Sequence, residues 1–143
     1  MITIAADHKA AALMQDVQLY LHARGLEVEN VGSLSEDEPA LLQAIIPHVV
    51  KQVQRGEAEF GILACGSGTG VEIGANRFRG IRAALCVLPQ QASFARNKDN
   101  ANVLCLSSYV ESDVHTILDA WLSTQFDGDE RRSQMLQDFD AWQ

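Results

Sequence analysis

A cysteine followed by alternating glycines is the feature of this sequence best suited to chemistry. Residues 60–70 read FGILACGSGTG, so an apolar run ends at Cys65 and continues directly into Gly66, Gly68 and Gly70. Glycines let a backbone turn its N–H groups inward, and with the amino end of a following helix these groups form a cradle for a phosphate or an oxyanion. The positive potential of these N–H groups also stabilises a thiolate, which makes Cys65 a candidate base or nucleophile.

Three known glycine-loop motifs do not fit this segment. A dinucleotide fingerprint that begins at Gly66 needs its third glycine at position 71, and a P-loop needs a lysine directly after its last glycine. A cysteine phosphatase loop needs an arginine six residues after its cysteine. All three motifs need their defining residue at position 71, where this chain has Val71. Free cysteine is more often a small buried apolar residue. We interpret Cys86 and Cys105 in that way, because no glycine adjoins either one.

A second polar group follows the first predicted strand. Asp7 and His8 would emerge at the same carboxyl edge of the sheet as the cradle, where an acid–base pair is expected. A helix-capping Asp7 beside an exposed His8 explains the pattern equally well. Asn76, on the helix after the cradle, could face the site or cap that helix. Lys98 and Asn100 lie in a segment, NKDNAN, whose composition is ordinary for a turn.

The composition indicates one globular domain over residues 1–143 in the cytoplasm. The chain has 47% hydrophobic and 21% charged residues, and its net charge of -8 disfavours nucleic acid and anionic membranes as partners. Three widely spaced cysteines without a C-x-x-C pair support neither disulfides nor structural zinc, and so favour a reducing compartment. No apolar run has the roughly 18 residues that a membrane helix needs.

The elements that position these residues alternate between strands and helices. Short β-rich runs at 2–6, 27–31, 60–64, 82–87 and 102–106 predict five strands, and the last three are apolar enough to be covered on both faces. Amphipathic stretches predict helices at 9–24, 39–55, 70–77, 90–97, 112–123 and 130–142, with a kink or break at Pro47. This order predicts an α/β fold, a doubly wound Rossmann-like three-layer sandwich around a five-stranded parallel sheet. The last helix could cover its own core or a partner subunit.

In combination, these motifs resemble the ribose-5-phosphate isomerase B family, which includes the galactose-6-phosphate isomerase subunits. The segments that carry the resemblance are ADH at 6–8, GEA at 56–58, GILACGSGTG at 61–70, ANR at 75–77, GIRAAL at 80–85, NANVL at 100–104 and FDG at 126–128, ahead of Arg131. They span nearly the whole chain. The resemblance implies a homodimer or a dimer of dimers with sites shared between subunits, and cofactor-free, metal-free interconversion of aldose and ketose phosphates.

The resemblance also implies a role for each candidate residue. The family's cysteine base falls on Cys65, which would take the proton from the carbon next to the carbonyl, and its cradle hydroxyl falls on Ser67. Asp7 and His8 would bind sugar hydroxyls and the phosphate end. The expected catalytic set is therefore Cys65, Ser67, Lys98 and Asp7. The expected substrate-binding set is His8, Gly66, Gly68, Thr69, Gly70, Asn76, Asn100, Arg131 and Arg132.

The sequence also departs from the family at several positions. Lys98 stands where most members have the histidine that opens the sugar ring, and residues 41–43 read LLQ where a Tyr-Pro segment is expected. Among the family's phosphate arginines Arg131 aligns clearly, whereas two others become Tyr109 and Met135. These departures leave two alternatives to an active isomerase. One is a regulatory or non-catalytic sugar-phosphate-binding relative, or one subunit of a mixed assembly. The other is a generic phosphate or nucleotide site on a flavodoxin-like sheet.

Overall fold

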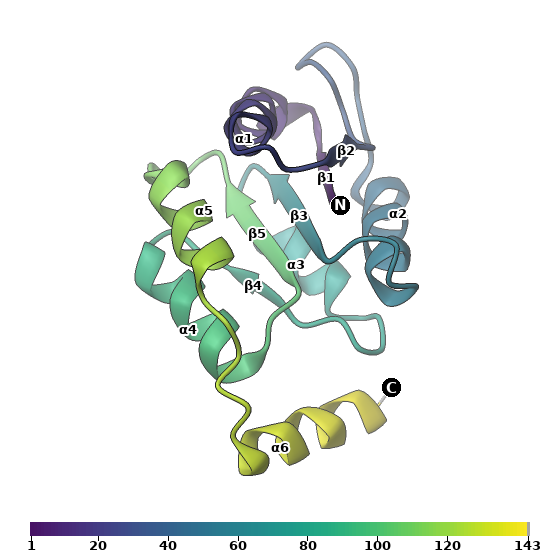
Figure 1. Ribbon diagram of the computed structural model, residues 1–143. Helices are drawn as coiled ribbons and strands as arrows, with labels where there is room; N and C mark the ends of the chain where they lie inside the picture. Colours follow the sequence, from purple (N-terminus) through teal and green to yellow (C-terminus); the bar gives the residue numbers. More distant parts are fainter. Residues whose placement is uncertain (143) are drawn as a thin grey trace.

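Five parallel strands form one sheet with helices on both faces. The structure is a computed structural model that describes residues 1–142. The strands are β1 (Ile2–Ala6), β2 (Val28–Asn30), β3 (Phe60–Cys65), β4 (Ala83–Leu85) and β5 (Val103–Ser107), in the spatial order β2-β1-β3-β5-β4 (Figure 1). The helices are the 3-10 helix η1 (His8–Ala10), α1 (Ala11–Ala23), α2 (Leu42–Gln54), α3 (Thr69–Ala75), α4 (Pro89–Asp99), α5 (Val114–Ser123) and α6 (Glu130–Ala141). The predicted doubly wound α/β fold is confirmed.

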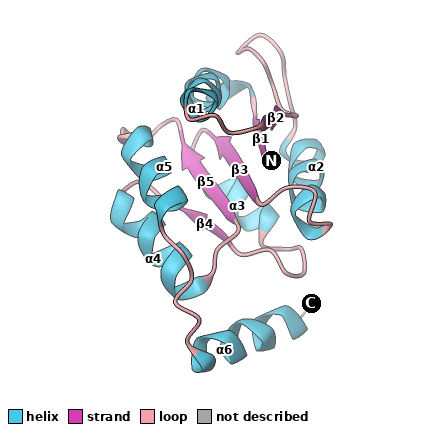
Figure 2. Cartoon of the chain, viewed as in Figure 1, coloured by secondary structure: helices cyan, strands magenta, loops and turns pink. Residues whose placement is uncertain are grey.

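Two apolar cores lie between the sheet and the helices that cover its two faces. Met14 and Leu21 of α1 and Trp121 of α5 pack on one face of the sheet together with alanines of α4. Val49 and Val50 of α2 and the buried side chains of α3 pack on the other face. The two sets of helices flank the strands in Figure 2. Because β3 is buried along its whole length, the segment that leads into the glycine cradle lies at the centre of the molecule.

Most predicted elements occur, and the outer strands are shorter than expected. The strands expected at 27–31 and 82–87 each contain only three residues, since β2 and β4 are the edge strands of the sheet. The helix expected from position 39 begins at Leu42 and continues through Pro47 to Gln54, so the predicted break at this proline does not occur. Buried Ile46 and Val49 on either side of Pro47 hold the helix against the sheet.

The carboxyl ends of the three central strands meet at one edge. Ala6 of β1 pairs with Ala64 of β3, and Cys65 of β3 pairs with Ser107 of β5. The loops that follow β1, β3 and β5 therefore leave the sheet side by side. This convergence is the expected position of a ligand site in an open parallel sheet.

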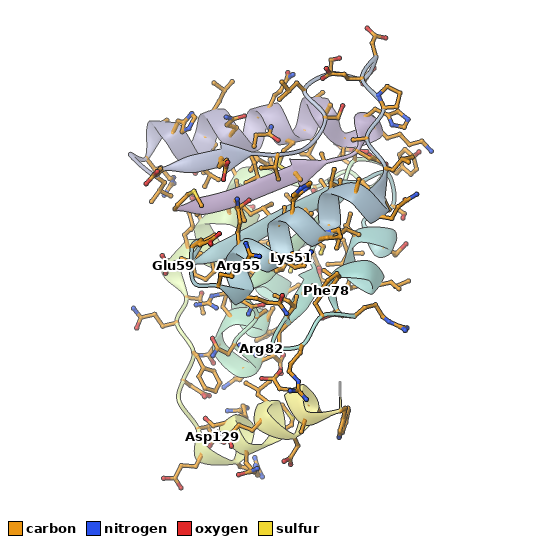
Figure 3. The ribbon with its side chains drawn as sticks, turned by 90° about the vertical axis from the view of Figure 1, so that its right-hand side faces the viewer. Lys51, Arg55, Glu59, Phe78, Arg82 and Asp129 are labelled. Carbon is orange, nitrogen blue, oxygen red and sulfur yellow. The ribbon has the colours of Figure 1, made fainter. Side chains whose placement is uncertain are left out.

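The last helix stands apart from the rest of the fold. In Figure 1 the arrowheads of β3 and β5 point away from α6, which lies beyond the opposite ends of the strands. Buried Leu136 and an ion pair of 3.5 Å between Arg82 and Asp140 connect α6 to the body of the chain. Figure 3 shows Arg82 between the body and α6. Phe139 and Trp142 remain 40% and 76% exposed. None of the helices in residues 1–142 is long and apolar enough to cross a membrane.

Candidate active site

Cys65 ends the central strand and its sulfur meets the backbone of the glycine loop. The N–H of Gly68 donates to Sγ of Cys65 at 3.2 Å. Gly68 has a φ of +78°, in the left-handed region, and a Cβ at this position would lie 3.0 Å from the carbonyl oxygen of Leu106. Glycine is needed here for both reasons. The cysteine is 4% exposed, so the thiol lies just beneath the surface of the loop.

Two exposed hydroxyls lie directly beyond this buried thiol. The side-chain oxygens of Ser67 and Thr69 are 2.8 Å apart, and the N–H of Thr69 donates to Oγ of Ser67 at 3.3 Å. Both residues are exposed, and Gly70 follows them in the first turn of α3. The loop therefore combines a thiol that accepts from the Gly68 N–H with two accessible hydroxyls beside it, and hydroxyls are donors that an oxyanion site can use.

Ser107, the last residue of β5, and Tyr109, two residues further on, form hydrogen bonds to the backbone of the cradle. Oγ of Ser107 donates to the carbonyl oxygen of Gly66 at 2.7 Å, and the N–H of Tyr109 donates to the same oxygen at 2.9 Å. A Cβ on Gly66 would lie 2.3 Å from the Tyr109 ring. Analysis of the sequence did not assign Ser107 to the site, and it noted Tyr109 only as standing at the position of a family phosphate arginine. The location of Ser107 at the end of an apolar run was the available signal.

Asp7 and His8 lie at the same edge, as expected. Oδ1 of Asp7 accepts from the N–H of Lys9 at 3.1 Å, and the N–H of Asp7 donates to the carbonyl oxygen of Ala64 at 3.2 Å. The carboxylate thus caps η1, which is the capping role weighed above. Nδ1 of His8 is buried and has no hydrogen-bond partner among the described residues.

The remaining cations of the expected site lie at the opposite edge. Lys98 is in the last turn of α4, which precedes β5, and Arg131 and Arg132 begin α6. Oδ2 of Asp127 lies 3.4 Å from Nζ of Lys98 and 2.5 Å from a guanidinium nitrogen of Arg132. Hydrogen bonding from the Asp129 N–H, and then from Lys98, lowers the pKa of Asp127. The structure does not bring these residues to Cys65 within one chain.

The two asparagines of the expected set form hydrogen bonds within the fold at that opposite edge. The amide of Asn76 donates to the carbonyl oxygen of Ala83 at 2.9 Å and accepts from its N–H at 2.8 Å, so it ties α3 to β4. Asn100 has a φ of +48° and ends α4, and its carbonyl oxygen accepts from Nε of Arg82 at 2.9 Å. These bonds position elements of the fold.

The other two thiols differ from Cys65 in their surroundings. Burial raises the pKa of Cys86 to about 12 and raises that of Cys105 well above its usual value. Neither adjoins the glycine loop, in agreement with their interpretation as packing residues. In residues 1–142 no group of three or more His, Cys, Asp or Glu side chains is arranged to hold a metal ion.

Comparison with known proteins places this chain among sugar isomerases. Residues 2–138 match the ribose/galactose isomerase family. Ribose-5-phosphate isomerase B of Escherichia coli (strain K12) is 36% identical over 133 residues, which cover 89% of this chain and 86% of that protein. D-erythrulose-4-phosphate isomerase of Pectobacterium atrosepticum is 33% identical over 129 residues, 89% and 85% of the two chains. The crystal structure of a ribose 5-phosphate isomerase from Thermotoga maritima superposes with a TM-score of 0.93 at 43% identity and covers 98% and 97% of the two chains.

Proposed function

This chain belongs to the ribose/galactose isomerase family and is a sugar-phosphate isomerase, and we propose that it interconverts the aldose and ketose forms of a small sugar phosphate with Cys65 as the base. Relatives named for ribose 5-phosphate and for erythrulose 4-phosphate support a substrate of four or five carbons. The observation that carries the cysteine assignment is the 3.2 Å hydrogen bond from the Gly68 N–H to Sγ of Cys65 beside two exposed hydroxyls.

The proposed reaction moves one proton between neighbouring carbons. The thiolate of Cys65 removes the proton from C2 of the open-chain aldose, and the electron pair flows to the carbonyl oxygen on C1. The resulting enediolate accepts hydrogen bonds from the N–H groups of Gly66, Gly68 and Gly70 and from the hydroxyl of Ser67. The O2 proton is transferred to O1, the electron pair of the O2–H bond forms the C2 carbonyl, and C1 takes back the proton held by the thiol. The thiolate is regenerated, so the step balances without an external acceptor.

We further propose that a second copy of the chain completes the site. Cys65 and the Asp7–His8 pair lie at the carboxyl edge of the sheet, whereas Lys98, Arg131 and Arg132 lie at the other edge. The exposed Phe139 and Trp142 of α6, beside a hollow of about 400 Å³ lined by Ile81 and Leu136, support an α6 that packs on a partner. A homodimer or a dimer of dimers would then bring the partner's cations to the cradle.

A substrate panel tests the activity and the base together. Pentose, tetrose and hexose phosphates are tested for aldose–ketose conversion and for exchange of the C2 proton with D₂O. We expect Cys65→Ala to lower C2 exchange at least about 100-fold. Cys86→Ala, which removes a buried thiol from the core on the other face of the sheet, is the matched control. A Cys65→Ala protein that exchanges the proton at the normal rate would eliminate this base.

Mixing two inactive variants tests the shared site. Cys65→Ala and Lys98→Met are purified separately, then unfolded and refolded together. In a random mixture half of the dimers are mixed, and each mixed dimer holds one unaltered site, so about a quarter of the sites recover. An equal mixture that stays inactive, although each variant refolds and dimerises, would exclude sharing of these two residues.

One observation favours a binding relative without turnover. Asp127 binds both Lys98 and Arg132, and Tyr109 stands at a position where the family has a phosphate arginine, so few free cations remain for the reacting sugar. This alternative predicts that sugar phosphates stabilise the protein against heat while no member of the panel isomerises. Turnover of any sugar phosphate in the panel would reject it.

A further inference from the structure

A lysine stands beside the cradle where the sequence lacks a family arginine. Lys9 follows the Asp7–His8 pair after β1, and Tyr109 follows β5. Because β1 and β5 flank β3, both residues are carried to the end of the strand that holds Cys65. Nζ of Lys9 lies 5.9 Å from the centre of the Tyr109 ring. Tyr109, in turn, contacts Gly66 of the cradle through its ring and its backbone N–H.

Lys9 is the one lysine or arginine that the topology places at this edge, within residues 1–142. Lys51 and Arg55 lie at the last turns of α2, and Arg82 precedes β4, all toward the amino ends of the strands (Figure 3). Arg96 and Lys98 lie in the last turn of α4, and the other arginines follow α1 or α3 or lie in α6, at the same far end. An anion that binds at the cradle therefore meets the positive charge of its own chain only at Lys9.

The surroundings fix the backbone of Lys9 and favour the charged form of its side chain. Oγ of Ser108 donates to the carbonyl oxygen of Lys9 at 2.9 Å. The nearby Tyr109 side chain is the largest of the influences that raise the pKa of Lys9, and the charges of Asp7 and Cys65 add to it. A hollow of about 400 Å³ adjoins the pair and is lined by Ser107 and Ser108 as well as by Glu36 and Glu111. Lys9 is the only cation in this lining.

We propose that Lys9, oriented by Tyr109, is the anion-binding residue that this chain contributes to its sugar-phosphate site. The proposal rests on the function proposed above and adds a specificity-determining residue to it. Arginine offers a planar fork and lysine a compact charge, so an ammonium from the β1 loop can replace the charge of the missing arginine but not its paired hydrogen bonds. The ring of Tyr109 supplies the surface over which the ammonium is held.

Binding of inorganic phosphate tests the proposal directly. We expect Lys9→Met to weaken phosphate binding about tenfold and Lys9→Arg to preserve it. Tyr109→Arg, added to Lys9→Met, should restore phosphate binding, because it places a cation beside the cradle again. Lys51→Met removes an exposed lysine of the same charge far from the cradle and is the matched control. Calorimetry gives the dissociation constants, and thermal unfolding verifies that each variant is folded.

Three binding results would overturn the proposal, and so would one kinetic result. The binding results are failure of the unaltered protein to bind phosphate, equal binding by Lys9→Met and the unaltered protein, and equal weakening by Lys9→Met and Lys51→Met. Turnover of the sugar panel is measured separately on the same proteins. Phosphate binding that depends on Lys9 without any isomerisation would reject the proposed function and keep the anion site. Isomerisation with a KM that is unchanged in Lys9→Met would keep the function and reject Lys9.

Discussion

Replacing Gly68 with alanine perturbs the loop that holds Cys65 in two ways. A φ of +78° costs a residue with a Cβ roughly 1 kcal/mol. The new Cβ would also lie 2.5 Å from Cδ1 of Leu85 and 3.0 Å from the carbonyl oxygen of Leu106. Crowding of this kind costs about 1–3 kcal/mol. We therefore expect the free energy of unfolding of Gly68→Ala to fall by about 2–4 kcal/mol.

The same substitution should also reduce activity more than stability alone requires. Relief of the contact with Leu106 needs a shift of the loop backbone, which moves the Gly68 N–H away from Sγ of Cys65. A displacement of about 1 Å in a reacting geometry can cost about 100-fold in rate. Folded Gly68→Ala protein should thus exchange the C2 proton of its sugar phosphate about 100-fold more slowly than the unaltered protein.

Gly56→Ala separates backbone strain from crowding. Gly56 has a φ of +71° and nothing lies within 4 Å of a Cβ built on it, so this variant should lose only about 1 kcal/mol and keep its activity. Urea unfolding followed by circular dichroism gives the stabilities, and deuterium incorporation at C2 gives the rates. Equal unfolding midpoints for the two variants, together with a normal exchange rate for Gly68→Ala, would refute the geometric argument for the cradle.

Three further predictions concern the surrounding fold. Burial raises the pKa of Cys86 from 9.0 to about 12, so the unfolded chain binds fewer protons between these pH values and the free energy of unfolding should fall as pH rises. Urea titrations should show that Cys86→Ala reduces this slope. Asn76→Ala removes two hydrogen bonds to Ala83 and should lower the free energy of unfolding by about 1–3 kcal/mol, and an unchanged urea midpoint would contradict this. Hydrogen bonding, chiefly from the Asp129 N–H, lowers the pKa of Asp127 in the folded protein below the value of 3.8. Its ionised carboxylate therefore adds to the free energy of unfolding above pH 3.8, and this stabilisation is lost as pH falls through the lower pKa of the folded state. Hydrogen exchange of α6 should accordingly speed up in acid relative to the central strands.

The strands and the cradle were predictable because their signals are local. An apolar run that ends in alternating glycines fixes the end of β3, the turn and the start of α3 within eleven neighbouring residues. The uninterrupted course of α2 through Pro47 could not be predicted in this way, because it depends on burial of Ile46 and Val49 against strands distant in the sequence. The bonds from Asn76 to Ala83 likewise join two elements whose spacing no sequence pattern reports.

The division of the charged residues between two edges follows from the parallel sheet itself. β5 has five residues, Val103–Ser107, so at about 3.3 Å per residue the Cα atoms of its first and last residues lie roughly 13 Å apart. Lys98 precedes this strand and Tyr109 follows it. The pairing of Cys65 with Ser107 places the thiol at the end where Tyr109 lies. A lysine side chain spans only about 6 Å, so Lys98 of the same chain cannot reach a sugar held at Cys65. If Lys98 acts on that sugar, it must come from another copy of the chain, whereas Lys9 can act within its own.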